Sequence, residues 1–322
     1  MIEKVPGIGD LLEEPKGITG GLLHKMYRVR TTKGVFAVKE MNSEIMKRPG
    51  VFENMVRSER IAARFGEELP VVSALEINGQ QIHFIEGYFY MVFPWMEGIS
   101  VFPPDIKKYH CEIMGDLLGR IHELDIRLSA GEDSSEEVPL YKWEEYLQKA
   151  VRQEVSWVEE YRKNLSDLQK QNQKACDAEQ VLKREQVISH RDLDPKNVMW
   201  NGEGAHIIDW EAAGPVNPYQ EFVECILYWA DDGKDGLSKD LFDAFVRAYR
   251  KHKDLGRVDW ESVSAGSCSG ILGWLAYNIR RALGIEAADE EEIRLGEELI
   301  PRAIKEFENY QKKVSLIQKW IK

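Results

Sequence analysis

The sequence predicts an α+β protein with two lobes, in which a small β-rich N-terminal lobe precedes a larger, mainly helical C-terminal lobe. Two observations lead to this prediction. Short runs of β-branched and aromatic residues, separated by glycine-bearing turns, lie on both sides of one predicted helix in the chain up to residue 93, and helical spacing of apolar residues dominates after it. We therefore expect an N-terminal lobe over residues 1–96 and a C-terminal lobe over residues 97–322.

The N-terminal lobe begins with a predicted hairpin. In residues 18–40, ITGGLLHKMYRVRTTKGVFAVKE, two strand-like runs flank a TTKG turn and follow a Gly-Gly loop. An inward stripe of Phe52, Met55, Glu59 and Ala62 then predicts a helix. The stretch VVSALEINGQQIHFIEGYFYMVF, which ends at residue 93, predicts three short strands with turns at NG and EG.

The C-terminal lobe is predicted to be helical. One amphipathic helix is expected over residues 143–168, because neither Pro nor Gly interrupts it and its apolar positions recur in steps of three and four. A second helical region is expected from about Tyr219 to Tyr249, with further helices towards the C-terminus. Residues 131–139, GEDSSEEVP, are expected to form an exposed loop.

Composition and charge exclude several classes of function. The chain of 322 residues carries 43 basic and 55 acidic residues, for a net charge of −12, which argues against a nucleic-acid partner. No apolar run is long enough to cross a bilayer, and the N-terminus does not resemble a secretion signal, so we expect a cytoplasmic protein with no membrane partner. The four scattered cysteines are expected to be free thiols: Cys111, Cys176, Cys225 and Cys268.

Residues 190–211, HRDLDPKNVMWNGEGAHIIDWE, carry the chemistry. Asp192 and Asn197 flank a Pro and therefore lie on a loop, and the VMW and HIIDW runs form a hairpin around NGEGA. This hairpin brings Asn197 beside Asp209, and an amide oxygen with a carboxylate suits Mg²⁺. Asp192 is left to accept a proton from an incoming hydroxyl. The alternative is a buried polar hairpin whose carboxylates are satisfied within the protein.

These residues resemble the catalytic loop and metal-binding Asp of the protein-kinase-like fold. With DWE in place of DFG, the segment looks like the aminoglycoside phosphotransferase and choline kinase family. The resemblance covers most of the chain. It implies that Asp192 is the catalytic base, that Asn197 and Asp209 are magnesium ligands, and that His190 braces the loop.

The AVK run of the first hairpin is the next matching feature. On an alternating strand Val35, Ala37 and Lys39 share a face. The resemblance implies that Ala37 lies over the adenine and that Lys39 reaches the α- and β-phosphates. Glu59 is expected to pair with Lys39, because an unpaired carboxylate on the inward face of a helix would be costly. Glu53 is the competing partner.

Two backbone segments complete the expected nucleotide site. Gly20 and Gly21 would let backbone N–H groups approach phosphates, although Tyr27 departs from a full GxGxxG pattern. The segment VFPWMEG is placed like the connection between the lobes of this fold. There the resemblance implies that Pro94 supplies a carbonyl and Met96 an N–H to the adenine. A plain linker is the alternative.

A protein kinase is disfavoured, so the acceptor is expected to be a small molecule. Asp194 stands where Ser/Thr kinases carry Lys, Glu211 replaces the Gly of DFG, and no activation loop is visible. Acidic and aromatic side chains would hold a cationic acceptor. The alternative is that the acids brace loops and the aromatics lie in the core. The expected acceptor-binding residues are Asp194, Trp210, Glu211, Glu221, Trp274 and Asn278.

The resulting prediction is an ATP- or GTP-dependent phosphotransferase that uses Mg²⁺ and acts on a small hydroxylated molecule. The resemblance implies an aminoglycoside-like acceptor, with choline, ethanolamine or a sugar as the alternative. A hypothesis of another class is a catalytically silent nucleotide-binding module. The protein is expected to be a monomer or a homodimer.

Overall fold

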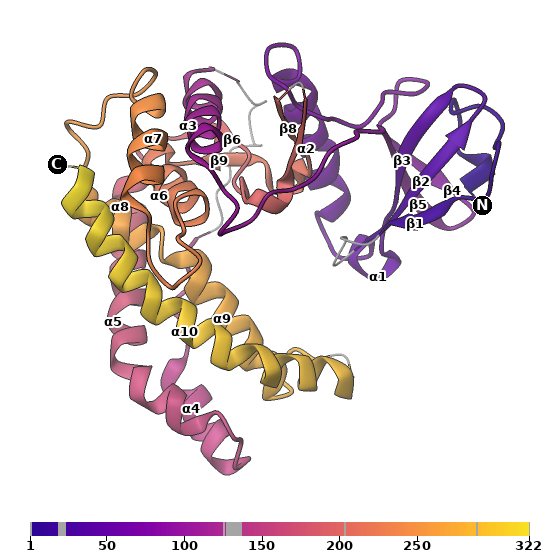
Figure 1. Ribbon diagram of the computed structural model, residues 1–322. Coiled ribbons are helices and arrows are strands. Elements are labelled where there is room, and N and C mark those ends of the chain that lie inside the picture. Colours follow the sequence, from indigo (N-terminus) through magenta and orange to yellow (C-terminus); the bar gives the residue numbers. More distant parts are fainter. Residues whose placement is uncertain are drawn as a thin grey trace. The chain divides into compact units, whose positions relative to one another are not determined.

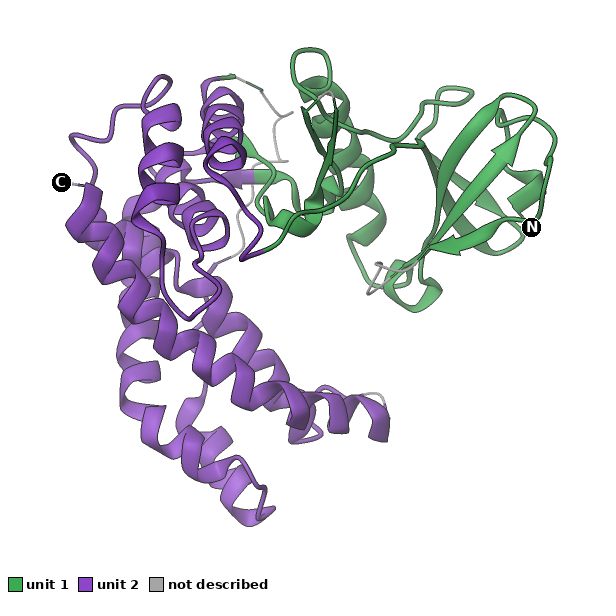
Figure 2. Ribbon diagram, viewed as in Figure 1, with its two compact units in different colours: residues 1–102, 124–128, 188–214 green, residues 103–123, 129–187, 215–322 purple. Residues whose placement is uncertain are grey.

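The computed structural model describes residues 2–18, 24–124, 126, 137–202, 204–287 and 289–321 (Figure 1). Contacts within the chain divide it into two compact units, which Figure 2 colours separately. Unit 1 comprises residues 1–102, 124–128 and 188–214, and unit 2 comprises residues 103–123, 129–187 and 215–322. The segment carrying the predicted chemistry therefore groups with the N-terminal part, whereas the sequence analysis assigns it to a C-terminal lobe.

A five-stranded antiparallel sheet forms the N-terminal part of unit 1. β2 and β3 form the expected hairpin, with Thr31 opposite Gly34 across a two-residue turn. Gly34 has a φ of 141°, a conformation that favours glycine. The strands lie in the order β1 (Lys16–Ile18), β2 (Lys25–Thr31), β3 (Gly34–Glu40), β5 (Tyr88–Pro94) and β4 (Ile82–Ile85).

The stretch expected to hold three strands contains two, β4 and β5, in the part that the structure describes. The VVSALEI run before them is extended, but it bonds two different neighbours. The N–H of Val72 donates to the Ile207 carbonyl over 2.9 Å, and the N–H of Leu75 donates to the Val92 carbonyl over 2.7 Å. Because the run passes from one neighbour to the other, it forms no continuous ladder.

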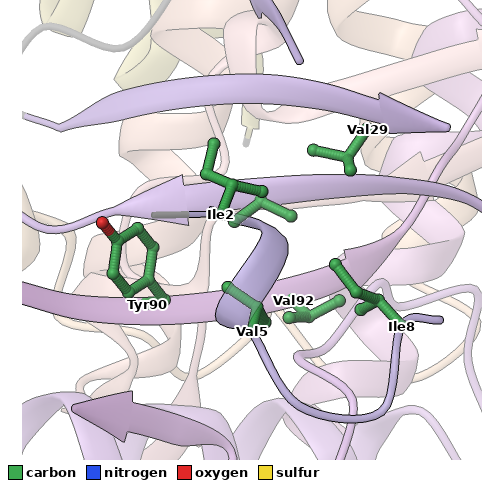
Figure 3. Packing of buried hydrophobic residues seen from close by; sticks show 7 residues of the cluster. Ile2, Val5, Ile8, Val29, Tyr90 and Val92 are labelled. Carbon is green, nitrogen blue, oxygen red and sulfur yellow. The ribbon is translucent and has the colours of Figure 1, made fainter. Parts of the chain in front are cut away.

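The N-terminal segment covers one face of the sheet. It contains the 3₁₀ helix η1 (Ile2–Lys4) and packs its apolar side chains onto β2 and β5 (Figure 3). Burying one such aliphatic side chain stabilises a fold by about 1.5–3 kcal/mol, so residues 2–8 contribute to the stability of unit 1. This core consists of Ile2, Val5, Ile8, Val29, Val38, Tyr90 and Val92.

A second core lies under α2 (Val51–Phe65), which follows the short α1 (Ser43–Met46). The expected helix is confirmed, and its buried stripe includes Met55, Glu59 and Ala62. Phe52, also expected to face inward, is instead 39% exposed. The core residues are Met41, Met55, Ala74, Ile82 and Met91.

The hairpin of β7 and β8 forms backbone hydrogen bonds with two segments of the N-terminal part, one at Pro70 and one at Ile99. The N–H of Ile207 donates to the Pro70 carbonyl over 2.9 Å, and Ile99 exchanges two backbone hydrogen bonds with Trp200. These bonds explain why this segment groups with unit 1. Its elements are η2 (Pro195–Asn197), β7 (Val198–Asn201), β8 (Gly204–Ile207) and η3 (Trp210–Ala212), while β6 (Val187–Ser189) and β9 (Gly214–Val216) lie across its boundaries with unit 2.

Unit 2 is helical. α3 and α7 pack closely at Gly115, where an added Cβ would lie 2.3 Å from the carbonyl oxygen of Phe245. The four cysteines are free thiols, as expected. Within the described ranges, every helix is too short or too polar to span a membrane. The helices are α3 (Lys108–Glu123), α4 (Trp143–Arg152), α5 (Val158–Leu182), α6 (Pro218–Trp229), α7 (Lys239–Tyr249), α8 (Trp260–Gly266), α9 (Ser269–Ala282) and α10 (Glu290–Ile321).

The single helix expected over residues 143–168 is wrong, because α4 and α5 are separate helices. Between them Glu154 has a φ of 53°, and a left-handed residue ends an α-helix. The region expected from Tyr219 to Tyr249 is likewise divided into α6 and α7. In the expected exposed loop, residues 131–136 lie outside the described residues.

Candidate active site

Asn197 and Asp209 meet where the β7–β8 hairpin opens. The register pairs Val198 with Ile207, and the N–H of Ile208 donates to the Asn197 carbonyl over 2.9 Å. Asp209 follows directly, with a φ of 61° that turns the chain into η3. The hairpin predicted from the sequence is confirmed, and it places both side chains at one end.

The buried ring of His190 braces the loop before this hairpin. Its Nδ1 accepts the N–H of Asp192 over 3.2 Å, and its Nε2 lies 3.0 Å from the Ile208 carbonyl oxygen. Because Nδ1 accepts, the neutral ring carries its proton on Nε2 and donates it to Ile208. The ring also packs edge-on against Trp210, with 4.6 Å between the ring centroids. The ring thus ties the loop to the end of β8.

The amide of Asn197 holds the carboxylate of Asp192. Its Nδ2 donates to Asp192 Oδ2 over 2.9 Å and to the Asp192 carbonyl over 2.8 Å. Asn197 Oδ1 accepts no hydrogen bond from the described residues. Asn197 therefore orients Asp192 with its nitrogen and presents its oxygen to a further partner, such as a cation.

Lys196 is a site residue that the sequence analysis missed. Its Nζ lies 3.2 Å from Asp192 Oδ2 and 3.8 Å from Asp194 Oδ2. Asp194 also caps η2 by accepting the N–H of Lys196 over 2.8 Å. Burial raises the pKa of Asp192, and the ammonium of Lys196 opposes that effect. The signal available in the sequence was the spacing of four residues between Asp192 and Lys196.

Lys39 reaches two carboxylates from β3. Its Nζ lies 3.0 Å from Asp209 Oδ1 and forms a second ion pair with Glu211 Oε1. The residue is only 8% exposed. Burial opposes the charge on Lys39, but the two carboxylates outweigh burial and raise its pKa. The cluster therefore brings one buried cation and two acids to the same point of unit 1.

The predicted Lys39–Glu59 ion pair is wrong. Glu59 is buried on α2, but its Oε2 accepts the N–H of Ala74 over 2.7 Å, while Glu211 takes the place expected for it on Lys39. Burial raises the pKa of Glu59 to about 7, despite the Ala74 hydrogen bond and the charge of Lys39. The left-handed turn at Asp209 explains the exchange, because it lets Asp209 and Glu211 both face Lys39.

Glu211 lies between Lys39 and His24. Its Oε2 is 3.5 Å from the Nε2 of His24, and its Oε1 contacts Lys39. Burial would raise the pKa of Glu211, but His24 and Lys39 lower it to about 2. Glu211 is thus an ionised member of the Lys39 cluster. Because its two oxygens face Lys39 and His24, its expected role in holding the acceptor is not supported.

The segment after β5 presents backbone groups for a ligand. The N–H of Trp95 donates to the Val35 carbonyl over 3.3 Å. Bonded and non-bonded pairs alternate in an antiparallel ladder, so the carbonyl of the preceding Pro94 points away from β3. The N–H of Met96 makes no hydrogen bond with the described residues. Ala37 pairs with β5 just before this segment.

The Gly-Gly loop cannot be placed beside these groups. Gly20 and Gly21 lie outside the described residues. Their contribution to phosphate binding stays a prediction.

Several residues expected to bind the acceptor are buried instead. Trp210 packs against Phe65, with 5.1 Å between the ring centroids. Glu221, on α6, is bonded to His122 over 2.8 Å, and this pair braces unit 2. An acceptor role for these buried side chains is not supported, and neither is it for the buried Asn278.

Trp274 is the exposed member of the expected acceptor set. Its side chain on α9 is 43% exposed, with 6.0 Å between its ring centroid and that of Tyr277. The guanidinium of Arg281 lies over the Tyr277 ring, 5.1 Å from its centroid, and an exposed aromatic face such as that of Trp274 can hold a cation. Trp274 and the partly exposed Asp194 remain predicted contacts of the acceptor.

A family model for phosphotransferase enzymes matches residues 14–257, which is most of the chain and includes Lys39, Asp192 and Asp209. The chain belongs to the phosphotransferase enzyme family. Such membership makes the protein a small-molecule phosphotransferase and agrees with the geometry of the Asp192 loop. No curated protein matches the chain in sequence.

Solved structures of this phosphotransferase's relatives share its fold. Spectinomycin phosphotransferase in complex with ADP and spectinomycin has a TM-score of 0.71 at 14% identity, over 96% of this chain and 97% of that one. A microcompartment-associated aminopropanol kinase has a TM-score of 0.63 at 15% identity, over 95% of each chain. Amicoumacin kinase in complex with AMP-PNP and Ca²⁺ has a TM-score of 0.61 at 14% identity, over 94% of this chain and 90% of that one. The kinase-like fold expected from the sequence is confirmed.

Proposed function

We propose that this phosphotransferase moves the γ-phosphate of ATP to a hydroxyl of a small cationic molecule, with an aminoglycoside-like compound as the first acceptor class. The observation that carries the proposal is that unit 1 contains two interacting pairs of side chains. Asp192 is held by Asn197 on the loop, and Lys39 is held by Asp209 at the end of the hairpin. The first pair supplies a base, and the second supplies a cation with an acid for phosphate and metal.

The nucleotide side of the proposal rests on Lys39, Pro94 and Met96. A buried ammonium attracts phosphate oxygens, and a carbonyl and an N–H two residues apart match the edge of an adenine. ATP is the proposed donor because the spectinomycin phosphotransferase holds ADP and the amicoumacin kinase holds AMP-PNP. GTP is tested as the alternative donor.

The residues present fit a divalent cation that prefers oxygen. Asn197 Oδ1 accepts no hydrogen bond from the described residues, and the carboxylate of Asp209 already attracts the cationic Nζ of Lys39. An amide oxygen and a carboxylate are the donors that Mg²⁺ takes. When bound, Mg²⁺ would neutralise charge on the transferring phosphate.

Asp192 is the proposed base. Its carboxylate is partly exposed, its direction is set by Asn197, and Lys196 lies beside it. The raised pKa of Asp192 makes its carboxylate a stronger acceptor for the proton of the acceptor hydroxyl. The remaining work of this chain is to position the hydroxyl against the phosphate.

The acceptor class is proposed from charge and likeness. Asp194 in unit 1 offers a carboxylate and Trp274 in unit 2 offers an aromatic face, and each by itself suits a cation. A small amino alcohol, of the kind that includes choline and ethanolamine, is the second candidate, and the likeness to the aminopropanol kinase favours it. The two candidates differ in size, and both carry a hydroxyl and a cationic nitrogen.

The test is nucleoside diphosphate release with Mg²⁺ and ATP or GTP, measured over a panel of aminoglycosides, choline, ethanolamine and aminopropanol. Asp192→Asn is expected to keep nucleotide binding and to lower turnover by about 10²–10⁴-fold, the usual contribution of a general base. The matched control is Asp243→Asn on α7, which removes an exposed carboxylate paired with Lys239. Its turnover should stay at the wild-type value.

The outcomes separate the hypotheses. Turnover with one acceptor class, lost in Asp192→Asn, would support the reaction and name the class. Full activity of Asp192→Asn would reject Asp192 as the base. If the wild type neither bound nucleotide nor turned over, the proposed function and the silent nucleotide-binding module would both be rejected.

A further inference from the structure

His24 is a buried histidine with a defined tautomer. It precedes β2 and is 8% exposed. Its Nδ1 lies 3.0 Å from the backbone nitrogen of Asn42, which can only donate. The Nδ1 atom therefore accepts, and in the neutral ring the proton is carried by Nε2. The Nε2–H group is therefore the one hydrogen-bond donor of the ring.

The Nε2–H group of His24 has one carboxylate within reach. Glu211 Oε2 lies 3.5 Å from Nε2, longer than a normal hydrogen bond. No described residue makes a hydrogen bond to this buried nitrogen. The other oxygen of Glu211 contacts Lys39, so the ring and the ammonium share one carboxylate. A small movement of Glu211 towards His24 would complete the bond.

A phosphate that binds Lys39 competes with Glu211 for the same ammonium. Lys39 and Glu211 are both largely buried, so a carboxylate that lost its cation would be left without a partner. His24 is placed to supply that partner from the opposite oxygen of Glu211. The donor on His24 therefore lowers the cost of freeing Lys39.

We propose that His24 is a positioning residue, whose Nε2–H group holds the Glu211 carboxylate and so frees Lys39 for the nucleotide. This inference rests on the proposed function, since it concerns how the nucleotide gains Lys39. It assigns no chemical step to His24, which acts only through Glu211. Its effect should therefore fall on nucleotide affinity and spare the rate of transfer.

Two substitutions separate this role from a structural one. In His24→Asn the side-chain amide reaches about as far as Nδ1, so it can still accept the Asn42 N–H but does not reach Glu211. In His24→Gln the amide reaches about as far as Nε2, so it can still donate to Glu211. A merely structural ring, needed for its bond to Asn42, would be replaced better by Asn than by Gln.

The measurement is the KM for Mg-nucleotide, its Kd by calorimetry, and kcat, in the wild type and in both variants. We expect His24→Asn to raise KM and Kd by about 10-fold to 100-fold, the usual effect of losing a hydrogen bond to a charged group, with kcat within about threefold. His24→Gln should recover most of that affinity. Repeating His24→Asn in a Glu211→Gln background should add little, since the partner charge is gone.

Three results would overturn the inference. They are wild-type affinity in His24→Asn, a loss in His24→Gln equal to that in His24→Asn, or an undiminished effect of His24→Asn in the Glu211→Gln background. Failure of the proposed function is recognised separately, because then the wild type itself would neither bind Mg-nucleotide nor turn over. Thermal unfolding of each variant checks that the fold is retained.

Discussion

Glu59 shows how a buried carboxylate makes stability depend on pH. Its pKa is raised by burial from an ordinary 4.5 to about 7, so the folded protein favours the protonated acid. Below pH 4.5 the group is protonated in both states and costs nothing. As pH rises towards 7 the unfolded chain ionises freely, and the folded state loses up to about 3 kcal/mol.

We therefore expect Glu59→Gln to stabilise the protein at pH 8 by about 1–3 kcal/mol, because glutamine keeps an acceptor for the Ala74 N–H and carries no charge. The gain should vanish near pH 5. Urea unfolding at the two pH values measures it. Glu53→Gln is the control, since Glu53 is exposed on the same helix. An equal difference at both pH values would show that Glu59 stays ionised in the folded protein.

Some site residues could be predicted from the sequence and others could not, for a local reason. Asn197 and Asp209 are brought together by a hairpin whose strands and turn follow one another directly in the sequence. The spacing of the residues was therefore sufficient to predict that they lie at the same end of it. The partner of Lys39 depends on the left-handed backbone of Asp209, and residue types do not reveal that conformation. The sequence analysis therefore weighed only Glu59 and Glu53 as partners of Lys39, whereas the structure pairs Lys39 with Glu211.

At the scale of helices, Gly115 on α3 is the described glycine at which an added Cβ would lie nearest to the backbone of another element. A Cβ there would lie 2.3 Å from the carbonyl oxygen of Phe245, and backbone cannot swing aside as a side-chain end can. We expect Gly115→Ala to destabilise unit 2 by about 1–3 kcal/mol, the usual cost of overpacking. Urea unfolding followed by circular dichroism measures the change.

Gly270→Ala is the matched control for that experiment. Gly270 lies on α9, with nothing within 4 Å of an added Cβ. Alanine there should stabilise by about 0.5–1 kcal/mol, because it loses less backbone entropy than glycine. If both substitutions stabilised the protein, the close packing of α3 on α7 would be disproved.

Helix and strand boundaries were harder to predict than the presence of the elements. α4 and α5 keep one apolar period across the break at Glu154, so periodicity alone joins them into one helix. The VVSALEI run has strand propensity, but its two hydrogen-bonded neighbours come from distant parts of the chain. The first error arises because residue types do not reveal the left-handed backbone at Glu154, and the second because contacts with distant segments decide the pairing of the VVSALEI run.

At the scale of the molecule, the proposed nucleotide and metal residues all belong to unit 1. Lys39, Pro94 and Met96 come from its sheet and the segment after it, and Asn197 and Asp209 from its hairpin. A ligand that binds only the folded state at 100 times its Kd stabilises that state by about 2.7 kcal/mol. The stabilisation should therefore be concentrated in the segments of unit 1.

Hydrogen exchange with and without Mg-ATP tests this expectation. Amides of β3, β5 and residues 190–211 should exchange more slowly in the complex, by up to about 100-fold at that concentration, because opening must first release the ligand. α4, in unit 2, holds none of the proposed nucleotide or metal residues and serves as the internal reference. Asp209→Asn and excess EDTA should each remove most of the slowing. Slowing that persisted in both would place the nucleotide independently of Asp209, and slowing confined to unit 2 would place it away from Lys39.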